Sequence, residues 1–488
     1  MIITILIILP FLSGLAAFFL SGRSVRNWAL AVSLAELCIA LYATSVFVPQ
    51  AGLQQVLNLP WIPALGIHYH VGIDGIGLLL ILLTALLMPF ILYSTAQNNL
   101  SKPGAYYGLM LLMQAALMGV FSALDGFLFY VFWEMALIPI WFLCLLWGKG
   151  NTVAVTLKFF IYTLFGSLLM LVALIYLYLQ TPQPHSFSMA ALYAVSGLNA
   201  NVQGWLFWAF FLAFAIKIPI FPFHSWQPDT YVTAPAQGTM LLSGIMLKMG
   251  IFGAIRWLIP VLPAGVHNWM PVAVALSVAG AVYASIIALQ QNDLKRLLAY
   301  SSMAHVGIMG AGLFSLTGNG LTGVVFQMLA HGINTVALFY VADIIERRNN
   351  TRNLNQLGGI ALADPRFAVL VFVCVLGAIA FPLTNGFIGE FYLLYGLFEF
   401  NPPLSIAGGL TIILSAAYML QFYQKTMFGN AASIPENRVY AGKTELYVLV
   451  PLSALILLTG IYPKPLLNLA APAIEQILQL AQFETLTN

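Results

Sequence analysis

Charged residues are scarce in this chain. Only 7% of its 488 residues are charged, whereas 61% are hydrophobic, and the mean hydropathy is +0.93. Soluble domains do not have this composition, which is typical of a polytopic membrane protein. The net charge of +3 is small and its charges are scattered, so nothing in it indicates nucleic-acid binding.

Cysteines and cofactor-binding motifs are scarcer still. Cys38, Cys144 and Cys374 lie in apolar stretches without a CxxC pair, so we expect small core residues and neither a disulfide framework nor a metal site. GxGxxG and Walker-type motifs are absent, and we expect no nucleotide, flavin or iron–sulfur cluster bound by this chain alone. The apolar N-terminus lacks a basic region and a cleavage site, which predicts a retained first span.

Long apolar runs make up most of the sequence. A span needs about 20 apolar residues, and by that measure the chain is an all-α membrane protein with about fourteen transmembrane helices. The segment 465–488 follows the last span and is predicted to be an interfacial helix or a tail that docks on a partner. The predicted spans are 2–21, 28–48, 71–93, 106–124, 126–147, 157–179, 205–222, 235–258, 270–290, 297–316, 320–344, 367–400 (broken), 404–428 and 446–463.

Lysines and arginines separate cleanly when the predicted loops alternate across the membrane. Fourteen of the 18 fall on one side, Arg256 and Lys464 fall on the other, and Lys217 and Lys248 lie inside spans. Cytoplasmic loops carry the excess of basic residues. We therefore predict that both termini lie outside and that the loop 347–366 faces the cytoplasm.

One span combines a charge with a helix break. Residues 205–229 read WLFWAFFLAFAIKIPIFPFHSWQPD, with Lys217 beside Pro219 and Pro222. A charge at the bilayer centre is costly, and loosened backbone survives there only against protein or water. The stretch predicts a polar cavity. The ionisable residues within spans, which are the candidates for function, are Glu134, Lys217, Lys248, His305, His331 and Glu390.

These polar residues recur at a nearly constant offset. The same offset takes Lys248 to Gln421, and an odd number of spans (five) separates the two sets. We therefore predict inverted repeats, each with a broken helix: helices 1–3 over 1–100, a first five-helix repeat over 101–260, a second over 261–430, and the last helix with a short tail over 431–488. The recurring pairs are Glu134 and His305, Lys158 and His331, and Lys217 and Glu390, at offsets of 171, 173 and 173 residues.

A row of buried glutamate, lysine and histidine suits proton transfer better than it suits an organic substrate. Burial changes the proton affinity of lysine and glutamate, and histidine titrates close to neutral pH. Each residue also has a structural alternative: a carboxylate bonded to a hydroxyl, a lysine that reaches an interface, or a satisfied core histidine. A membrane scaffold whose charges merely pair is the corresponding alternative for the whole chain.

The other ionisable residues fall into two groups. Glu36, Asp74 and Asp125 are expected to serve helix packing or end capping. A second group lies near the predicted cytoplasmic ends, where it would anchor spans or frame a route for proton uptake. Its members are Lys158, Asp229, Lys295 and Arg296.

Seven stretches between about residues 70 and 430 resemble the antiporter-like subunits of respiratory complex I, the proton-pumping NADH:quinone oxidoreductase. M-type subunits are the most similar. In that family a seventh-span lysine pairs with a fifth-span glutamate, matching Lys217 and Glu134, and an eighth-span lysine matches Lys248. Glu390 matches the twelfth-span glutamate, where L- and N-type subunits typically carry lysine. The stretches are GIDGIGLLLILLTAL, FWEMALIPIWFLCLLWG, FAIKIPIFPFHSWQPD, LLSGIMLKMG, QNDLKRLLAYSSMAHVGIMG, FQMLAHGINTVALF and NGFIGEF.

The resemblance implies fourteen helices with two inverted repeats, in a membrane arm between L- and N-type neighbours. Quinone reduction in other subunits would drive protons through this chain, with FMN, iron–sulfur clusters and quinone bound by those partners and no cofactor here. The compact termini favour a bacterial plasma (inner) membrane. The alternatives are a subunit of a multisubunit sodium/proton antiporter or of a membrane-bound hydrogenase-type complex.

Three positions depart from the family pattern. Tyr231 and Thr233 stand where the family often has a histidine and an acidic or amide residue, which would alter proton uptake. Leu383 stands where a glycine usually precedes the threonine of the second break. Leucine tolerates fewer backbone conformations than glycine, so the break is expected to be less permissive.

Overall fold

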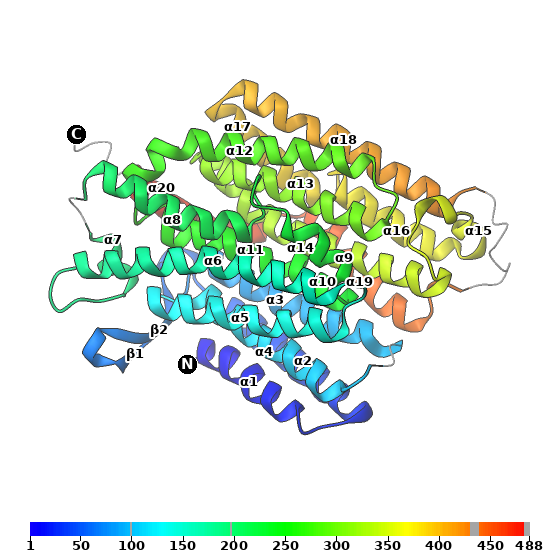
Figure 1. Cartoon of the computed structure of the whole chain (residues 1–488), viewed down its shortest axis with the longest axis horizontal. Coiled ribbons are helices and arrows are strands. Elements are labelled where there is room, and N and C mark those ends of the chain that lie inside the picture. The colour runs from blue at the N-terminus through cyan, green and yellow to red at the C-terminus, as the bar shows by residue number, and fades with distance from the viewer. Residues whose placement is uncertain (98–99, 196–197, 430–438, 483–488) are drawn as a thin grey trace.

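The computed structural model describes residues 1–97, 100–195, 198–429 and 439–482, and this part of the chain is mostly helical (Figure 1). Twelve stretches are long and apolar enough to cross a membrane. They are α2 (Gly22–Ser45), α3 (Gly75–Tyr93, extended to Gln97), α4 (Pro103–Ser122), α5 (Gly126–Trp147), α6 (Thr152–Gln180), α8 (Ala200–Lys217), the composite Ala236–Leu258, α12 (Pro263–Leu289), α13 (Leu294–Phe314), α14 (Gly318–Asn349), α18 (Pro402–Met427) and α19 (Lys443–Ile461).

The remaining two predicted spans fall on shorter helices. The first is α1 (Ile2–Ala17), and the span 367–400 is divided into α16 (Pro365–Ala378) and α17 (Asn385–Phe400). All fourteen predicted spans therefore coincide with a helix or a helix pair, and the chain is a multi-pass membrane protein. The smaller helices are α7 (Met189–Tyr193), α9 (Trp226–Thr233) and α15 (Ile360–Ala363).

Two helices are broken where the sequence predicts. α8 ends at Lys217, an irregular turn covers 218–225, and α9 follows; the second break covers 379–384 between α16 and α17. Proline has no N–H to donate, so each break leaves carbonyl groups to be satisfied otherwise. The Trp226 indole N–H donates to the Ile216 carbonyl at 2.9 Å, and the Thr384 hydroxyl donates to the Phe381 carbonyl at 2.7 Å.

A third irregularity was not predicted. The composite span consists of α10 (Ala236–Leu241), a π-helical turn Leu242–Met246, α11 (Leu247–Gly253) and a second π-helical turn Ala254–Leu258. Such turns inside α-helices are rare and frequently accompany functional sites. Lys248 lies directly after the first of these π-helical turns.

A β-hairpin precedes α3, and the prediction of a span beginning at residue 71 is wrong at that end. β1 (Gln54–Ile62) pairs antiparallel with β2 (Ile67–Ile73), with Leu57 opposite Val71. Ile67, Val71 and Ile73 are buried, and the last three residues of β2 are buried in succession as the chain enters the bundle. Hydropathy did not separate the strand from the apolar run that follows it.

The last helix, α20 (Lys464–Gln482), packs on this chain itself. It lies against α3 and α14 through Ala470, Ala473 and Ile474. A Cβ atom at Gly75 would come within 1.7 Å of the Leu469 carbonyl oxygen, so only glycine allows this close approach. The predicted docking tail is therefore an intramolecular element; residues 483–488 of that prediction lie outside the described residues.

Burial differs sharply between helices. α14 and the composite span are buried along their whole spanning length, whereas only 28% of the α18 span is buried. α2 is also a peripheral helix, and Cys38 on it is exposed, so the prediction of a core residue is wrong there. Cys144 and Cys374 are buried as expected. Figure 1 shows the hairpin and α7 at the same end of the bundle.

Candidate functional site

Lys248 and His331 form a hydrogen-bonded pair in the centre of the bundle. Both side chains are almost fully buried, and Lys248 Nζ lies 2.8 Å from His331 Nδ1. The Lys248 amine also donates to the Ser243 carbonyl at 2.6 Å, within the π-helical turn. A bond between two nitrogens needs one of them to accept, so this pair holds at most one excess proton.

Two serines extend this pair. His331 Nε2 lies 3.1 Å from the Ser302 hydroxyl, which lies 3.1 Å from the Ser243 hydroxyl. The π-helical turn Leu242–Met246, α11, α13 and α14 thus meet around one polar chain. Hydroxyl groups both donate and accept, so each of them can pass a proton on.

His305 and Glu390 form a second pair. His305 Nδ1 lies 2.5 Å from Glu390 Oε1, and the Gln327 amide donates to the same oxygen at 3.4 Å. Glu390 is buried near the start of α17, beyond the second helix break. The other ring nitrogen of His305 is shielded and has no hydrogen-bond partner among the described residues.

A small cavity lies between the two pairs. It measures about 20 Å³ and is lined by Ser301, Ser302, His305, Gln327, His331 and Asn334 among others. About 10–15 Å³ is enough for one water molecule when polar partners surround it. The rings of His305 and His331 are 6.3 Å apart, a gap that one such molecule spans.

Lys217 and Glu134 lie at the other end of this row, but they form no direct ion pair. Lys217 is 2% exposed, and its Nζ lies 5.4 Å from the Trp133 ring centroid. The two charges interact electrostatically, although no N–O distance between them is 4.0 Å or less. Tyr130 and Ser167 are the polar neighbours of the Glu134 carboxyl. The predicted Glu134–Lys217 proximity therefore holds at longer range.

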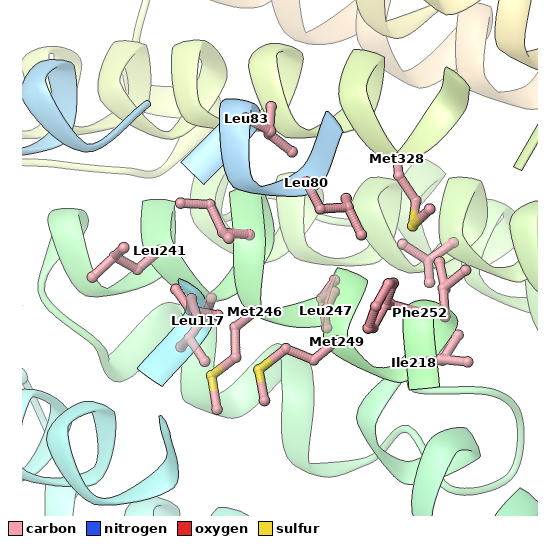
Figure 2. Close-up of a cluster of buried hydrophobic side chains, with 14 of the residues drawn as sticks. Leu80, Leu83, Leu117, Ile218, Leu241, Met246, Leu247, Met249, Phe252 and Met328 are labelled. Atoms are coloured by element: carbon pink, nitrogen blue, oxygen red, sulfur yellow. The ribbon is translucent and has the colours of Figure 1, made fainter. Parts of the chain in front are cut away.

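Lys217 also adjoins the helix that carries Lys248. A Cβ atom at Gly250 would lie 3.1 Å from Lys217 Cβ, so α11 packs directly on the first helix break. Apolar side chains fill this part of the core; Figure 2 shows Ile218, Leu247, Met249, Phe252 and Met328 in one buried hydrophobic cluster. An apolar shell lowers the local dielectric, which strengthens every charge interaction inside it.

Basic residues predicted for the cytoplasmic ends do gather at one end of the bundle, called here the basic end. Asp229 accepts from Lys158 and from Arg296, at 3.2 Å each, and Lys158 also donates to the Ser225 carbonyl at 2.7 Å. Lys295 donates to the Ala234 carbonyl at 3.0 Å. This cluster lies at α9, just beyond the first helix break.

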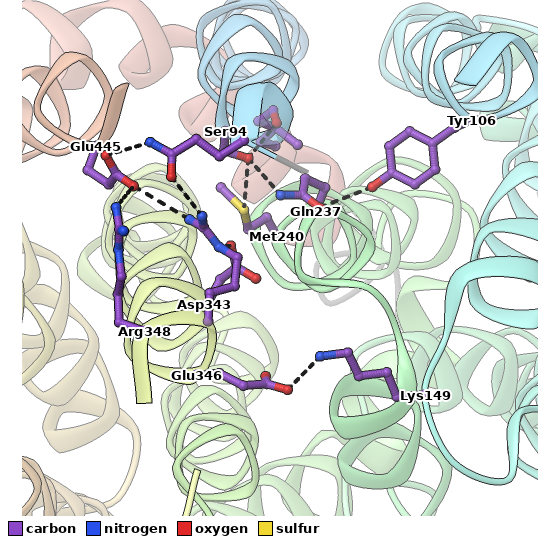
Figure 3. A network of polar contacts seen from close by, with 12 residues as sticks. Ser94, Tyr106, Lys149, Gln237, Met240, Asp343, Glu346, Arg348 and Glu445 are labelled. Carbon is purple, nitrogen blue, oxygen red and sulfur yellow. Dashed lines mark hydrogen bonds and ion pairs between the residues drawn. The ribbon is translucent and has the colours of Figure 1, made fainter. Parts of the chain in front are cut away.

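A second network at the basic end was not predicted. Figure 3 shows Glu445 between arginines of α14, with Lys149 and Glu346 paired nearby. Glu445 is fully buried and lies 3.4 Å from Arg348 and 3.8 Å from Arg347, which also pairs with Asp343. Sequence spacing gave no signal for it, because Glu445 is 97 residues from Arg348.

The opposite end carries one buried ion pair. Arg256 donates to Asp74 at 2.7 Å, and Asp74 also caps α3 by accepting from Gly77 N–H at 2.8 Å. Asp125 caps α5 through the N–H groups of Phe127 and Leu128, as expected. Burial raises the pKa of the Asp125 carboxyl, and these backbone donors partly oppose the rise.

Two expected residues have different surroundings from those predicted. Gln421, which the repeat offset pairs with Lys248, lies within the α18 span, but its side chain is exposed. Glu36 is buried in α2 but caps nothing, since neither carboxyl oxygen has a hydrogen-bond partner among the described residues. His, Cys, Asp and Glu side chains of the described residues form no group of three that could hold a metal.

Leu383 lies within the second break, and Tyr231 lies in α9, which follows the first break. Leu383 adopts a φ of 73°, in the left-handed region that favours glycine, a conformation that the sequence analysis did not predict. Tyr231 is fully buried in α9, with its hydroxyl beside Ser243 and Ser302. The hydroxyl therefore lies near the polar chain of the first pair, although it forms no hydrogen bond with the described residues.

Related proteins share this architecture. A sequence profile described as "NADH:quinone oxidoreductase/Mrp antiporter, TM" matches residues 123–415, more than half of the chain. The NADH-quinone oxidoreductase subunit M of Rickettsia prowazekii is 35% identical over 98% of this chain and 98% of its own length. The F(420)H(2) dehydrogenase subunit M of Methanosarcina mazei is also 35% identical, over 98% of this chain and 98% of its own.

Solved structures agree with the sequence relatives. A chain of respiratory complex I from Thermus thermophilus with bound NADH superposes with a TM-score of 0.91 at 30% identity, over 99% of this chain and 100% of that one. A chain of the Mrp complex from Dietzia sp. gives 0.84 at 21% identity over 98% of each, a likeness of fold alone. This chain therefore belongs to the family of membrane subunits common to NADH:quinone oxidoreductases and Mrp antiporters.

Proposed function

We propose that this chain is the M-type, proton-translocating subunit of an NADH:quinone oxidoreductase. It contributes no redox centre. Quinone reduction in other subunits, which bind FMN, iron–sulfur clusters and quinone, drives the protons through it. One observation carries the proposal: the histidines of two buried pairs, Lys248–His331 and His305–Glu390, line one small cavity. Family membership and the 35% identity to a subunit M support the same conclusion.

The geometry suggests the order of transfer. A proton on Lys248 passes to His331 Nδ1 across 2.8 Å, and the opposite ring nitrogen then releases one toward Ser302. The cavity leads from there to the unpartnered nitrogen of His305, whose Nδ1 faces Glu390. Each step covers a hydrogen bond or a single bridging molecule, the reach within which proton transfer is efficient.

The charges of Lys217 and Glu134 control this proton transfer. Their charges attract at a distance, without a direct bond that would hold them. Lys217 is at the end of α8, so movement of the break changes its distance to Glu134 and to the helix of Lys248. Changing the charge on one of the pair alters the cost of charging Lys248 in this low-dielectric setting.

The proposal also includes the membrane, the neighbouring subunits and the orientation of the chain. We place the chain in a bacterial plasma membrane, between L- and N-type neighbours, with both termini outside. Two inverted five-helix repeats, 101–260 and 261–430, account for the two broken helices in corresponding positions. The basic end, where Lys158 and Arg296 share Asp229, then faces the cytoplasm and receives protons.

Substitution of Lys217 tests the proposal. Lys217→Ala lowers proton pumping and coupled quinone reduction, while the complex still assembles; Glu134→Gln has the same effect. Lys464→Ala, which removes an exposed lysine at the start of α20, is the matched control. Full activity with full pumping in Lys217→Ala would overturn the assignment.

A sodium/proton antiporter or a membrane-bound hydrogenase-type complex is the alternative, because the matching profile covers antiporter subunits as well. The subunits that co-purify with the tagged chain in mild detergent decide between them. Flavin- and iron–sulfur-binding subunits would support the oxidoreductase. Small cation-antiporter subunits in their place would support the antiporter, and sodium flux would then be the activity to measure.

A further inference from the structure

A polar pocket opens at the basic end, far from the proton-sharing pairs. Its volume is about 370 Å³, and it lies between the start of α2 and the adjoining ends of α3 and α4. Arg23 and Arg26 line it together with Thr95, Gln97, Pro103 and Tyr107. Nothing in the proposed proton path uses these residues.

The two arginines lack the carboxylate partners that other arginines have. Arg296 pairs with Asp229, Arg352 with Asp293 and Arg256 with Asp74. Arg23 and Arg26 form no ion pair within the described ranges. Arg26 donates only to the Ala96 carbonyl, at 3.3 Å, and its shielded Nε has no partner there. The pocket therefore holds two positive charges whose hydrogen-bonding capacity is largely unused.

The surroundings indicate an amphipathic ligand. α2 begins at Gly22, α4 begins at Pro103 and α3 ends at Tyr93, so the pocket lies where three apolar spans reach the level of lipid headgroups. Just before it, the α1–α2 turn exposes Phe18 at 43% and Phe19 at 91%. An anionic group in the pocket would thus have apolar surface beside it for hydrocarbon chains.

We propose that this pocket binds the phosphate headgroup of an anionic phospholipid. Guanidinium groups match phosphate oxygens with two parallel hydrogen bonds. Basic pockets between membrane helices are suited to such headgroups. A soluble anion would use the arginines but not the exposed phenylalanines, and so explains only half of the site. The proposal is independent of the proton pathway, since it needs only the bilayer.

Photo-crosslinking on the intact complex tests it. Phosphatidylglycerol with a photoreactive group near the headgroup is added to delipidated complex, and labelled peptides are mapped by mass spectrometry. We expect labelling of the segments around 20–30 and 95–107. Arg23→Gln with Arg26→Gln should reduce it roughly 25-fold, because each basic group near an anionic lipid contributes about fivefold. Arg366→Gln, another arginine without an ion pair among the described residues, is the matched control.

Competition on the unmodified complex gives a second measurement that needs no variant. Excess phosphatidylglycerol should abolish the labelling, and excess phosphatidylcholine or inorganic phosphate should leave it. Displacement by inorganic phosphate would mean a soluble anion and overturn the lipid assignment, as would equal competition by phosphatidylcholine. Unchanged labelling in the double variant, or loss of a neighbouring subunit from it with lipid labelling intact, would also overturn it.

Discussion

Glu390→Gln separates proton transfer from packing at the site. Glutamine has the shape of glutamate and still accepts a hydrogen bond from His305, but it cannot take up a proton. The charge-assisted bond to His305 becomes a neutral one, at a cost of about 1 kcal/mol. The complex should therefore assemble, and its thermal midpoint should change by only a few degrees.

The effect on transfer should be much larger. A proton that reaches His305 in this variant creates an imidazolium with no buried counter-charge, since Gln327 is the only other side chain bonded to that carboxylate in the described structure. Breaking a buried charge pair costs about 3–5 kcal/mol. At about 1.4 kcal/mol per factor of ten, transfer past His305 should slow by roughly two to four orders of magnitude.

Reconstituted liposomes give the measurement. NADH and a short-chain quinone start turnover, a pH-sensitive dye reports lumen acidification, and an uncoupler shows whether turnover is limited by the proton gradient. Pumping and quinone reduction should fall together and stay low with uncoupler. Glu399→Gln changes an exposed carboxylate on the same helix, bonded to Asn319, and should leave both rates unchanged. Pumping at the unmodified rate in Glu390→Gln would refute the relay.

Four smaller predictions follow from individual residues. Leu383→Gly should raise the free energy of unfolding by about 1 kcal/mol in thermal denaturation, because Leu383 has a φ of 73° and is 66% exposed; a fall would contradict the strain. Glu36→Leu should also raise it, by about 1–3 kcal/mol, with pumping unchanged, since the unpartnered carboxyl is costly to bury; a destabilised variant would reveal a hidden partner. Tyr231→Phe should slow pumping several-fold at unchanged stability if protons pass its hydroxyl, and unaltered pumping would exclude that route. A cysteine at Asn355 should react with a membrane-impermeant thiol reagent only from the cytoplasmic side, and reaction from outside would reverse the topology.

The helical architecture was predictable because lipid imposes it locally. Every backbone group of a span must be satisfied within its own helix, so length and hydropathy identify the spans. The same rule located the first break, through Lys217 beside Pro219 and Pro222, and the span 367–400 was also predicted to be broken. It failed at the hairpin before α3 and at Cys38, where the fold and not the local composition decides what is buried.

The candidate site was predictable only as a set of residues. Glu134, Lys217, Lys248, His305, His331 and Glu390 were all selected because a buried ionisable group in a membrane needs compensation. The side chains that form hydrogen bonds with them were not predicted. Nothing in the sequence joins Lys248 to His331 at 83 residues' separation, or gives Ser243 and Ser302 a place between them. The ion-pair network of Glu445 was not predicted for the same reason.

The sequence by itself determined the membrane setting, the number of spans, the family resemblance and the ionisable residues that must be accommodated. Those follow from composition and spacing along one chain. Tertiary structure alone decided that Lys248 pairs with His331, that His305 pairs with Glu390 and that Lys217 stands apart from Glu134. It also decided that two arginines beside α4 have no carboxylate partner within the described part of the chain. Hydrogen bonds act over about 3 Å between helices that are distant in sequence, and only their packing sets such distances.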